Sequence, residues 1–124
     1  MFRKVFLATE AIPERSTYQY RTSLLTSAGD PVEPGQVVSI LATLRDLATG
    51  TFINTRTAQE VKGQNGGVMV SGEFSLQFES ADTPIVGAAG LERHVLTLDF
   101  RLVGGGRVTR EVWHYVANFA DITV

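Results

Sequence analysis

The residues from Val68 to Glu79 read VMVSGEFSLQFE, and they alternate in polarity. Every even position from 68 to 78 is apolar or glycine, whereas the odd positions after Met69 are serine, glutamate or glutamine. Successive side chains of a pleated strand point to opposite faces. This period of two therefore predicts one half-buried β-strand over residues 68–79.

The same period returns in residues 92–103 and 108–119, near the end of the chain. Three glycines, 104–106, separate these two runs. Glycine adopts left-handed backbone conformations without steric cost, so this arrangement predicts a β-hairpin. Strands with one polar side are typical of antiparallel sheets that pack face to face.

Four further strands are expected over residues 16–26, 36–46, 51–55 and 58–62. In the second of these, the inward set is expected to be Val38, Ile40, Ala42 and Leu44. Residues 46–50 are expected to form a tight turn, and residues 81–91 a loop that crosses between sheets. The fold class is therefore all-β: an immunoglobulin-like antiparallel β-sandwich of about seven or eight strands. We expect residues 1–15 to form an N-terminal arm, either helical or extended, and residues 16–124 to form the sandwich domain.

Composition narrows the class of protein. The 124 residues are 44% hydrophobic and 19% charged, and the net charge is −2. The composition is typical of a globular protein, and the length corresponds to about one domain. The nine arginines and two lysines are scattered rather than clustered, so a nucleic-acid partner is not expected. The chain contains no cysteine, which excludes disulfides and thiolate chemistry. Residues 1–7 lack the apolar core of a signal peptide, and no stretch predicts a membrane span.

Candidate metal ligands are few. His94 and His114 lie on the two strands of the last predicted hairpin, and pairing could bring them together. Because no third ligand follows at a suitable spacing, we expect ordinary sheet positions and no metal. Asp30, Asp46 and Asp82 lack the pattern of a calcium loop and are interpreted as turn residues.

Catalytic constellations are also missing. No serine occupies a Gly-x-Ser-x-Gly elbow, and no lysine follows the glycines of residues 63–67 as in a phosphate loop. Asp99 and Glu111 could face each other across the last hairpin, but Arg101 and Arg110 on the same strands favour a solvated surface of mixed charge. We therefore expect neither enzymatic activity nor a cofactor.

Both faces of the last strand are partly apolar from Val112 onward. One face is expected to pack in the core, and the other needs a cover. Either the N-terminal arm covers it within the same chain, or another subunit does. The candidate interface residues are Phe2, Val5, Phe6, Leu7, Trp113, Tyr115 and Phe119.

Several segments together resemble the small immunoglobulin-like modules of tailed-bacteriophage virions. They are ILATLRDLATG at residues 40–50, GEFSL at 72–76, ERHVLTL at 92–98 and YVANF at 115–119. The resemblance implies a non-enzymatic structural protein that assembles in several copies in a capsid, neck, tail or baseplate. Its expected location is the virion, its partners are further copies and other virion proteins, and no membrane is involved.

A second class of function stays open at this point. A module that binds carbohydrate or a host surface would use exposed aromatic side chains, such as Tyr18, Tyr20 or Trp113, to stack on a sugar ring. Light scattering distinguishes the two, because assembly predicts a stable oligomer.

Overall fold

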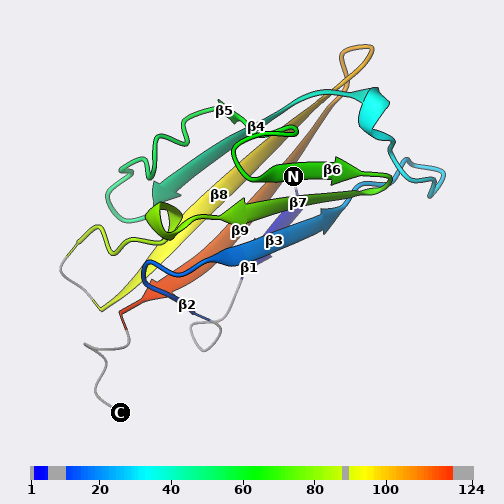
Figure 1. The fold of residues 1–124 in the computed structure, drawn as a ribbon. Helices are drawn as coiled ribbons and strands as arrows, with labels where there is room; N and C mark the ends of the chain where they lie inside the picture. Colours follow the sequence, from blue (N-terminus) through cyan, green and yellow to red (C-terminus); the bar gives the residue numbers. More distant parts are fainter. Residues whose placement is uncertain (1, 6–10, 88–89, 119–124) are drawn as a thin grey trace.

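A computed structural model describes residues 2–5, 11–87 and 90–118, with only the backbone for residues 2–5. Within these residues nine strands form two sheets that pack face to face (Figure 1). The first sheet has the order β1-β9-β8-β4-β5, with β2 also paired to β9, and the second has the order β3-β7-β6. The strands are β1 (Phe2–Val5), β2 (Ile12–Pro13), β3 (Tyr18–Ser23), β4 (Val37–Asp46), β5 (Gln59–Glu60), β6 (Gly67–Val70), β7 (Glu73–Phe78), β8 (Leu91–Leu102) and β9 (Arg107–Ala117). The prediction of an all-β sandwich is confirmed, and its immunoglobulin-like topology stays a prediction.

The β8–β9 hairpin forms the middle of the larger sheet. Its strands pair from Leu91↔Ala117 to Arg101↔Arg107, and β4 pairs with the other side of β8. Gly104 and Gly105 have φ angles of 90° and 93°, which only glycine adopts without strain. The predicted hairpin is therefore confirmed in both its position and its cause.

The prediction of one strand over residues 68–79 is wrong. The chain turns back at Ser71 and Gly72, so that β6 and β7 form a hairpin in which Val70 pairs with Glu73. Gly72 has a φ of 72°, as a turn requires. Across this two-residue turn, the even positions of β6 lie on the same face as the odd positions of β7. Val68 is therefore on the outer face and is 54% exposed, whereas Phe74 is on the inner face and is fully buried.

Strand β4 differs from its prediction at one end. Ile40, Ala42 and Leu44 are buried as expected, but Val38 is 62% exposed and Val37 is buried in its place. The register of β4 against β8 shifts between Val37 and Ser39, as in a β-bulge. One extra residue in a strand exchanges the two faces, which explains the difference.

The N-terminal segment joins the sheet of its own chain. β1 and β2 both run parallel to β9, with Val5 opposite Trp113 and Ile12 opposite Val116. All other strand pairs are antiparallel. Ile12 is 3% exposed and belongs to the core. The backbone of this segment thus covers the edge of β9.

The core lies between the two sheets. Phe74 of the smaller sheet meets Phe100 of the larger one edge to face, with ring centroids 5.4 Å apart. Both rings are fully buried. Because the chain has no disulfide, burial of the whole apolar core between the sheets is the main source of stability.

A buried ion pair adds a polar link beside the core. Arg56 and Asp82 are 2% and 0% exposed, and the guanidinium donates two hydrogen bonds of 2.6 and 2.8 Å to the carboxylate. Arg56 also donates to the side chain of Gln59 and to the backbone carbonyl of Asn65. It therefore ties three separate loops together. Asp82 is the last residue of a 3-10 turn, Ser80–Asp82, so its interpretation as a turn residue is correct but incomplete.

Candidate functional site

The predicted interface strand β9 presents two aromatic side chains on the face opposite the core. Trp113 and Tyr115 are both partly buried. The guanidinium of Arg93 lies 5.5 Å from the Trp113 ring centroid and 4.7 Å from that of Tyr115, and it also donates a hydrogen bond to the Tyr115 hydroxyl. The indole nitrogen donates to Glu111. One arginine thus covers part of both rings.

Part of this outer face of β8 and β9 is shielded from solvent. Val95 pairs with Trp113, yet Val95 is fully buried although it lies outside the core cluster between the sheets. Of the other predicted interface residues, Phe2 and Val5 are described only by their backbone pairing to β9. The remaining three lie outside the described residues: Phe6, Leu7 and Phe119.

Of the two tyrosines proposed for stacking on a sugar, Tyr20 is buried and Tyr18 is partly buried. Tyr20 is 3% exposed and belongs to the core. Burial raises its pKa, and this effect outweighs the opposite effects of Thr22 and Arg110. Tyr18 packs against Phe78 with ring centroids 6.1 Å apart. The expectation that Tyr20 could meet a ligand is therefore wrong.

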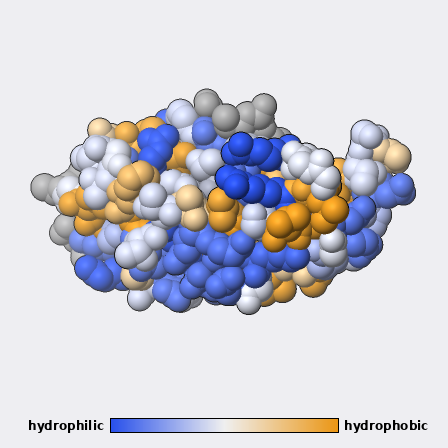
Figure 2. Space-filling model, turned by 90° about the horizontal axis from the view of Figure 1, so that it is seen from above, coloured by the Kyte–Doolittle hydropathy of each residue, from blue (hydrophilic) through white to orange (hydrophobic). Residues whose placement is uncertain are grey.

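Among the described residues, the three most exposed large apolar side chains lie elsewhere, near the β8–β9 turn. There Leu25 is 58% exposed, Val38 62% and Val103 64%. Figure 2 shows that apolar residues of the upper face occur in patches between hydrophilic ones. Exposed apolar residues in a group are typical of contact surfaces, whereas single ones are not informative.

A cavity of about 530 Å³ opens at this same end, between the β8–β9 hairpin and the segment that joins β3 to β4. Most of its wall is apolar, and Arg110 adds one cationic side chain. The lining residues are Leu24, Leu25, Thr26, Ser27, Val32, Gly35, Gln36, Leu102, Val103, Val108 and Arg110. We call this feature the end cavity. No sequence pattern indicates this cavity, because it forms only where two segments far apart in the chain meet.

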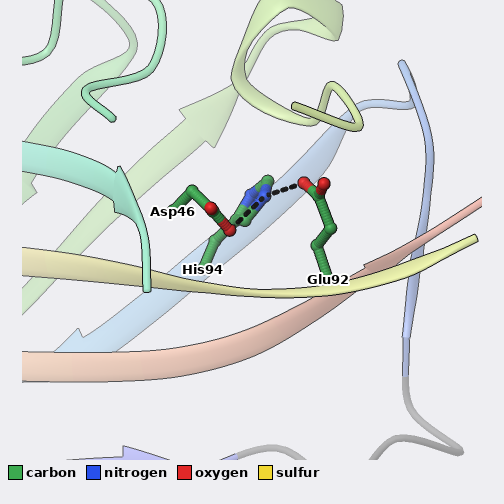
Figure 3. A group of neighbouring side chains, drawn as sticks. All are labelled: Asp46, Glu92 and His94. Atoms are coloured by element: carbon green, nitrogen blue, oxygen red, sulfur yellow. Dashed lines mark hydrogen bonds and ion pairs between the residues drawn. The ribbon is translucent and has the colours of Figure 1, made fainter. Parts of the chain in front are cut away.

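A second group of side chains gathers where β4 ends beside β8. Asp46, Glu92 and His94 point toward one another in Figure 3. Nε2 of His94 lies 3.0 Å from Oε1 of Glu92 and 3.9 Å from Oδ1 of Asp46. His94 is fully buried and Asp46 is 3% exposed. The sequence predicts Asp46 as a turn residue and no third ligand beside the two histidines.

The turn role of Asp46 is also correct. Its Oδ2 accepts hydrogen bonds from the backbone nitrogen and the hydroxyl of Thr49, at 3.1 and 2.7 Å. Gly50 closes the turn with a φ of 73°. Asp46 therefore shapes the turn with one oxygen and faces His94 with the other.

His94 and His114 are direct neighbours across the hairpin, as their predicted pairing allowed. Their ring centroids are 5.9 Å apart and the rings meet edge to face. Burial, and secondarily the nearby His94, lowers the pKa of His114 to about 3, so its imidazole is neutral at neutral pH.

Asp99 and Glu111 are not opposite each other. Asp99 pairs with Thr109, and Glu111 pairs with Thr97. The Asp99 carboxylate accepts hydrogen bonds from Arg107 and Arg101, and the bond from Arg107 is the main cause of its lowered pKa. The interpretation of this region as a surface of mixed charge agrees with these contacts.

No protein-family model, curated protein or solved structure matches this chain. Within the described residues, no helix has the length and apolar character to cross a bilayer. The functional inference therefore depends on the surface and the side-chain clusters themselves.

Proposed function

We propose that this protein is a non-enzymatic structural protein of a tailed-bacteriophage virion, and that it assembles in several copies through the end cavity. The observation that carries the proposal is the coincidence of this apolar cavity with Leu25 and Val103, both more than half exposed. A partner side chain seated in such a cavity acts as an anchor, because it is fully desolvated there.

The exposed apolar side chains at this surface can contribute free energy to association. Complete burial of a leucine or valine side chain stabilises by about 1.5–3 kcal/mol, and roughly half of that is still unused when the side chain is 60% exposed. Leu25, Val38 and Val103 together therefore offer a few kcal/mol before the partner's own apolar groups are counted. Each 1.4 kcal/mol of such a contribution changes the affinity about tenfold.

The resemblance to virion modules supports the proposed location. It rests on strand and turn segments, among them the turn at residues 46–50 and the β8–β9 hairpin, both of which the structure contains. The predicted contacts of the β9 face, through Trp113 and Tyr115, are a second part of the same proposal.

The carbohydrate-binding alternative has less support. Tyr20 is in the core, Tyr18 packs on Phe78, and the Trp113 ring carries Arg93 on one side. Stacking on a sugar needs an aromatic face that is free in the unbound protein. We therefore do not propose this second function.

Light scattering of the purified protein tests the proposal. The wild type is expected to form an oligomer, and Val103→Asp is expected to weaken it about tenfold or more, because it places an unpaired charge at the contact. Val68→Asp is the matched control, since Val68 is also about half exposed but lies on β6 and does not line the end cavity.

Circular dichroism should show the same β-rich spectrum for all three proteins. A wild type that is monomeric at every concentration would contradict assembly in several copies. Equal weakening by Val103→Asp and Val68→Asp would contradict the assignment of the contact to the end cavity.

A further inference from the structure

The Asp46–Glu92–His94 cluster has the donor set of a metal site. Each residue offers one ligand atom, and these atoms all lie within 4.8 Å of one another. Two carboxylate oxygens and one imidazole nitrogen suit first-row divalent metals, zinc among them. Tetrahedral zinc places its ligands about 3.3–3.4 Å apart, so the distance from Nε2 of His94 to Glu92 must widen from 3.0 Å and the distance to Asp46 must shorten from 3.9 Å.

The two carboxylates are already oriented by neighbouring donors. Oδ2 of Asp46 is held by Thr49, which leaves Oδ1 as the oxygen nearest His94. The Glu92 carboxylate accepts backbone hydrogen bonds of 2.8 Å from Val86 and 2.5 Å from Gly87. Outer partners of this kind fix the ligands of metal sites and are important for affinity.

An independent observation comes from two nitrogens without hydrogen-bond partners. Among the described residues, the only buried side-chain polar atoms without one are Nδ1 of His94 and Nε2 of His114. When Nε2 of His94 carries the proton and donates to Glu92, Nδ1 is a lone acceptor. His114 bonds to the backbone of Val112 through its ring, and its Nε2 is then a lone acceptor as well.

A metal ion on Nε2 of His94 changes this arrangement. The ring proton then resides on Nδ1, so His94 becomes a donor on the side that has no partner. The neighbouring His114 ring, 5.9 Å away between centroids, holds an unused acceptor. Metal binding therefore makes Nδ1 of His94 a donor beside a ring that holds an unused acceptor, whereas both nitrogens are acceptors in the metal-free hydrogen bonds.

The cluster can also be reached from outside. Asp46 and Glu92 line a cavity of about 540 Å³, together with Thr49, Arg93 and Tyr115. This cavity provides an entry path for the ion and room for water as a further ligand. Sites with three protein ligands and one open position are well known for zinc.

We propose that Asp46, Glu92 and His94 bind one divalent transition-metal ion, with zinc as the best match, and that water from the cavity completes the coordination. The ion joins the end of β4 to the start of β8 and, through Glu92, to the loop at Val86 and Gly87. This inference goes beyond the proposed assembly and does not depend on it.

Isothermal titration of zinc into chelator-treated protein tests this site. The wild type is expected to bind one ion per chain, and Asp46→Asn to lower the affinity about tenfold or more. Asparagine retains an oxygen that can accept from Thr49, so the turn can still form. Asp99→Asn is the matched control, because Asp99 is a carboxylate of the same sheet that lies outside the cluster, and it should bind zinc like the wild type.

The tautomer of His94 is a second readout that needs no variant. Nitrogen NMR of the wild type should show the His94 proton on Nε2 without zinc and on Nδ1 with one equivalent of zinc. Absence of binding by the wild type, or a His94 tautomer that zinc leaves unchanged, would overturn the proposal. Equal loss of affinity in Asp46→Asn and Asp99→Asn would assign binding to general surface charge and would also overturn it.

Discussion

Replacement of Asp82 by alanine is expected to destabilise the fold by about 3–5 kcal/mol, the usual cost of removing one partner of a buried ion pair. Asp82 is fully buried and accepts four hydrogen bonds. Two come from Arg56, one from the side chain of Asn54 at 2.9 Å, and one from the backbone nitrogen of Glu79 at 2.8 Å. The alanine variant leaves the Arg56 guanidinium, which is 2% exposed, without its counter-charge.

Urea unfolding followed by the fluorescence of Trp113, the only tryptophan, measures this loss. Asp99→Ala is the matched control, because Asp99 also pairs with an arginine, but the Arg107 side chain is 63% exposed. Surface pairs of this kind contribute about 0–1 kcal/mol. If Asp82→Ala cost no more than Asp99→Ala, our account of Arg56 as a link between three loops would be refuted.

A double variant separates the charge from the packing. Arg56→Met combined with Asp82→Leu removes both charges together, and we expect it to recover much of the stability lost in Asp82→Ala. Burial raises the pKa of Asp82, but the hydrogen bonds from Arg56, Asn54 and the Glu79 backbone outweigh this and lower it overall. The stabilisation by this carboxylate is therefore present above its unfolded pKa of about 4 and is lost as the pH falls through the lower folded pKa.

Three further predictions concern other parts of the fold. Gly67→Ala should destabilise by about 1–3 kcal/mol or more in urea unfolding, because its Cβ would lie 1.7 Å from the carbonyl oxygen of Val61, whereas Gly35→Ala meets no atom within 4 Å and should be nearly neutral. The pKa of about 3 for His114 lies below its unfolded value of about 6.5, so the free energy of unfolding should fall as the pH is lowered between these values, and His114→Phe should flatten this dependence; an unchanged slope would show that His114 is not the cause. Trp113→Ala should reduce the oligomer seen by light scattering with little change in circular dichroism if the β9 face is intermolecular, and a variant that unfolds would place Trp113 in the monomer's own structure.

The hairpin of β8 and β9 was predictable because its signals are local. Each strand alternates in polarity, and three consecutive glycines separate them. The β6–β7 hairpin was missed because the alternation continues through its turn. The dipeptide Ser71-Gly72 was the available signal, and with it the exposure of Val68 and Val70 follows from the change of face across the turn.

The cluster of Asp46, Glu92 and His94 could not be predicted in the same way. Asp46 and His94 are brought together by the register of β4 against β8, which pairs these two residues directly. Register depends on the whole set of buried side chains and on the bulge between Val37 and Ser39, so spacing along the chain does not reveal it. The end cavity could not be predicted for a similar reason, because it forms between residues 24–36 and residues 102–110, which are far apart in the sequence.

A side-chain-resolution map of the assembled protein tests the central claim most directly. We predict that a neighbouring subunit occupies the end cavity and contacts Leu25 and Val103. A map in which these two side chains face solvent, while the subunits meet through other surfaces, would contradict the account.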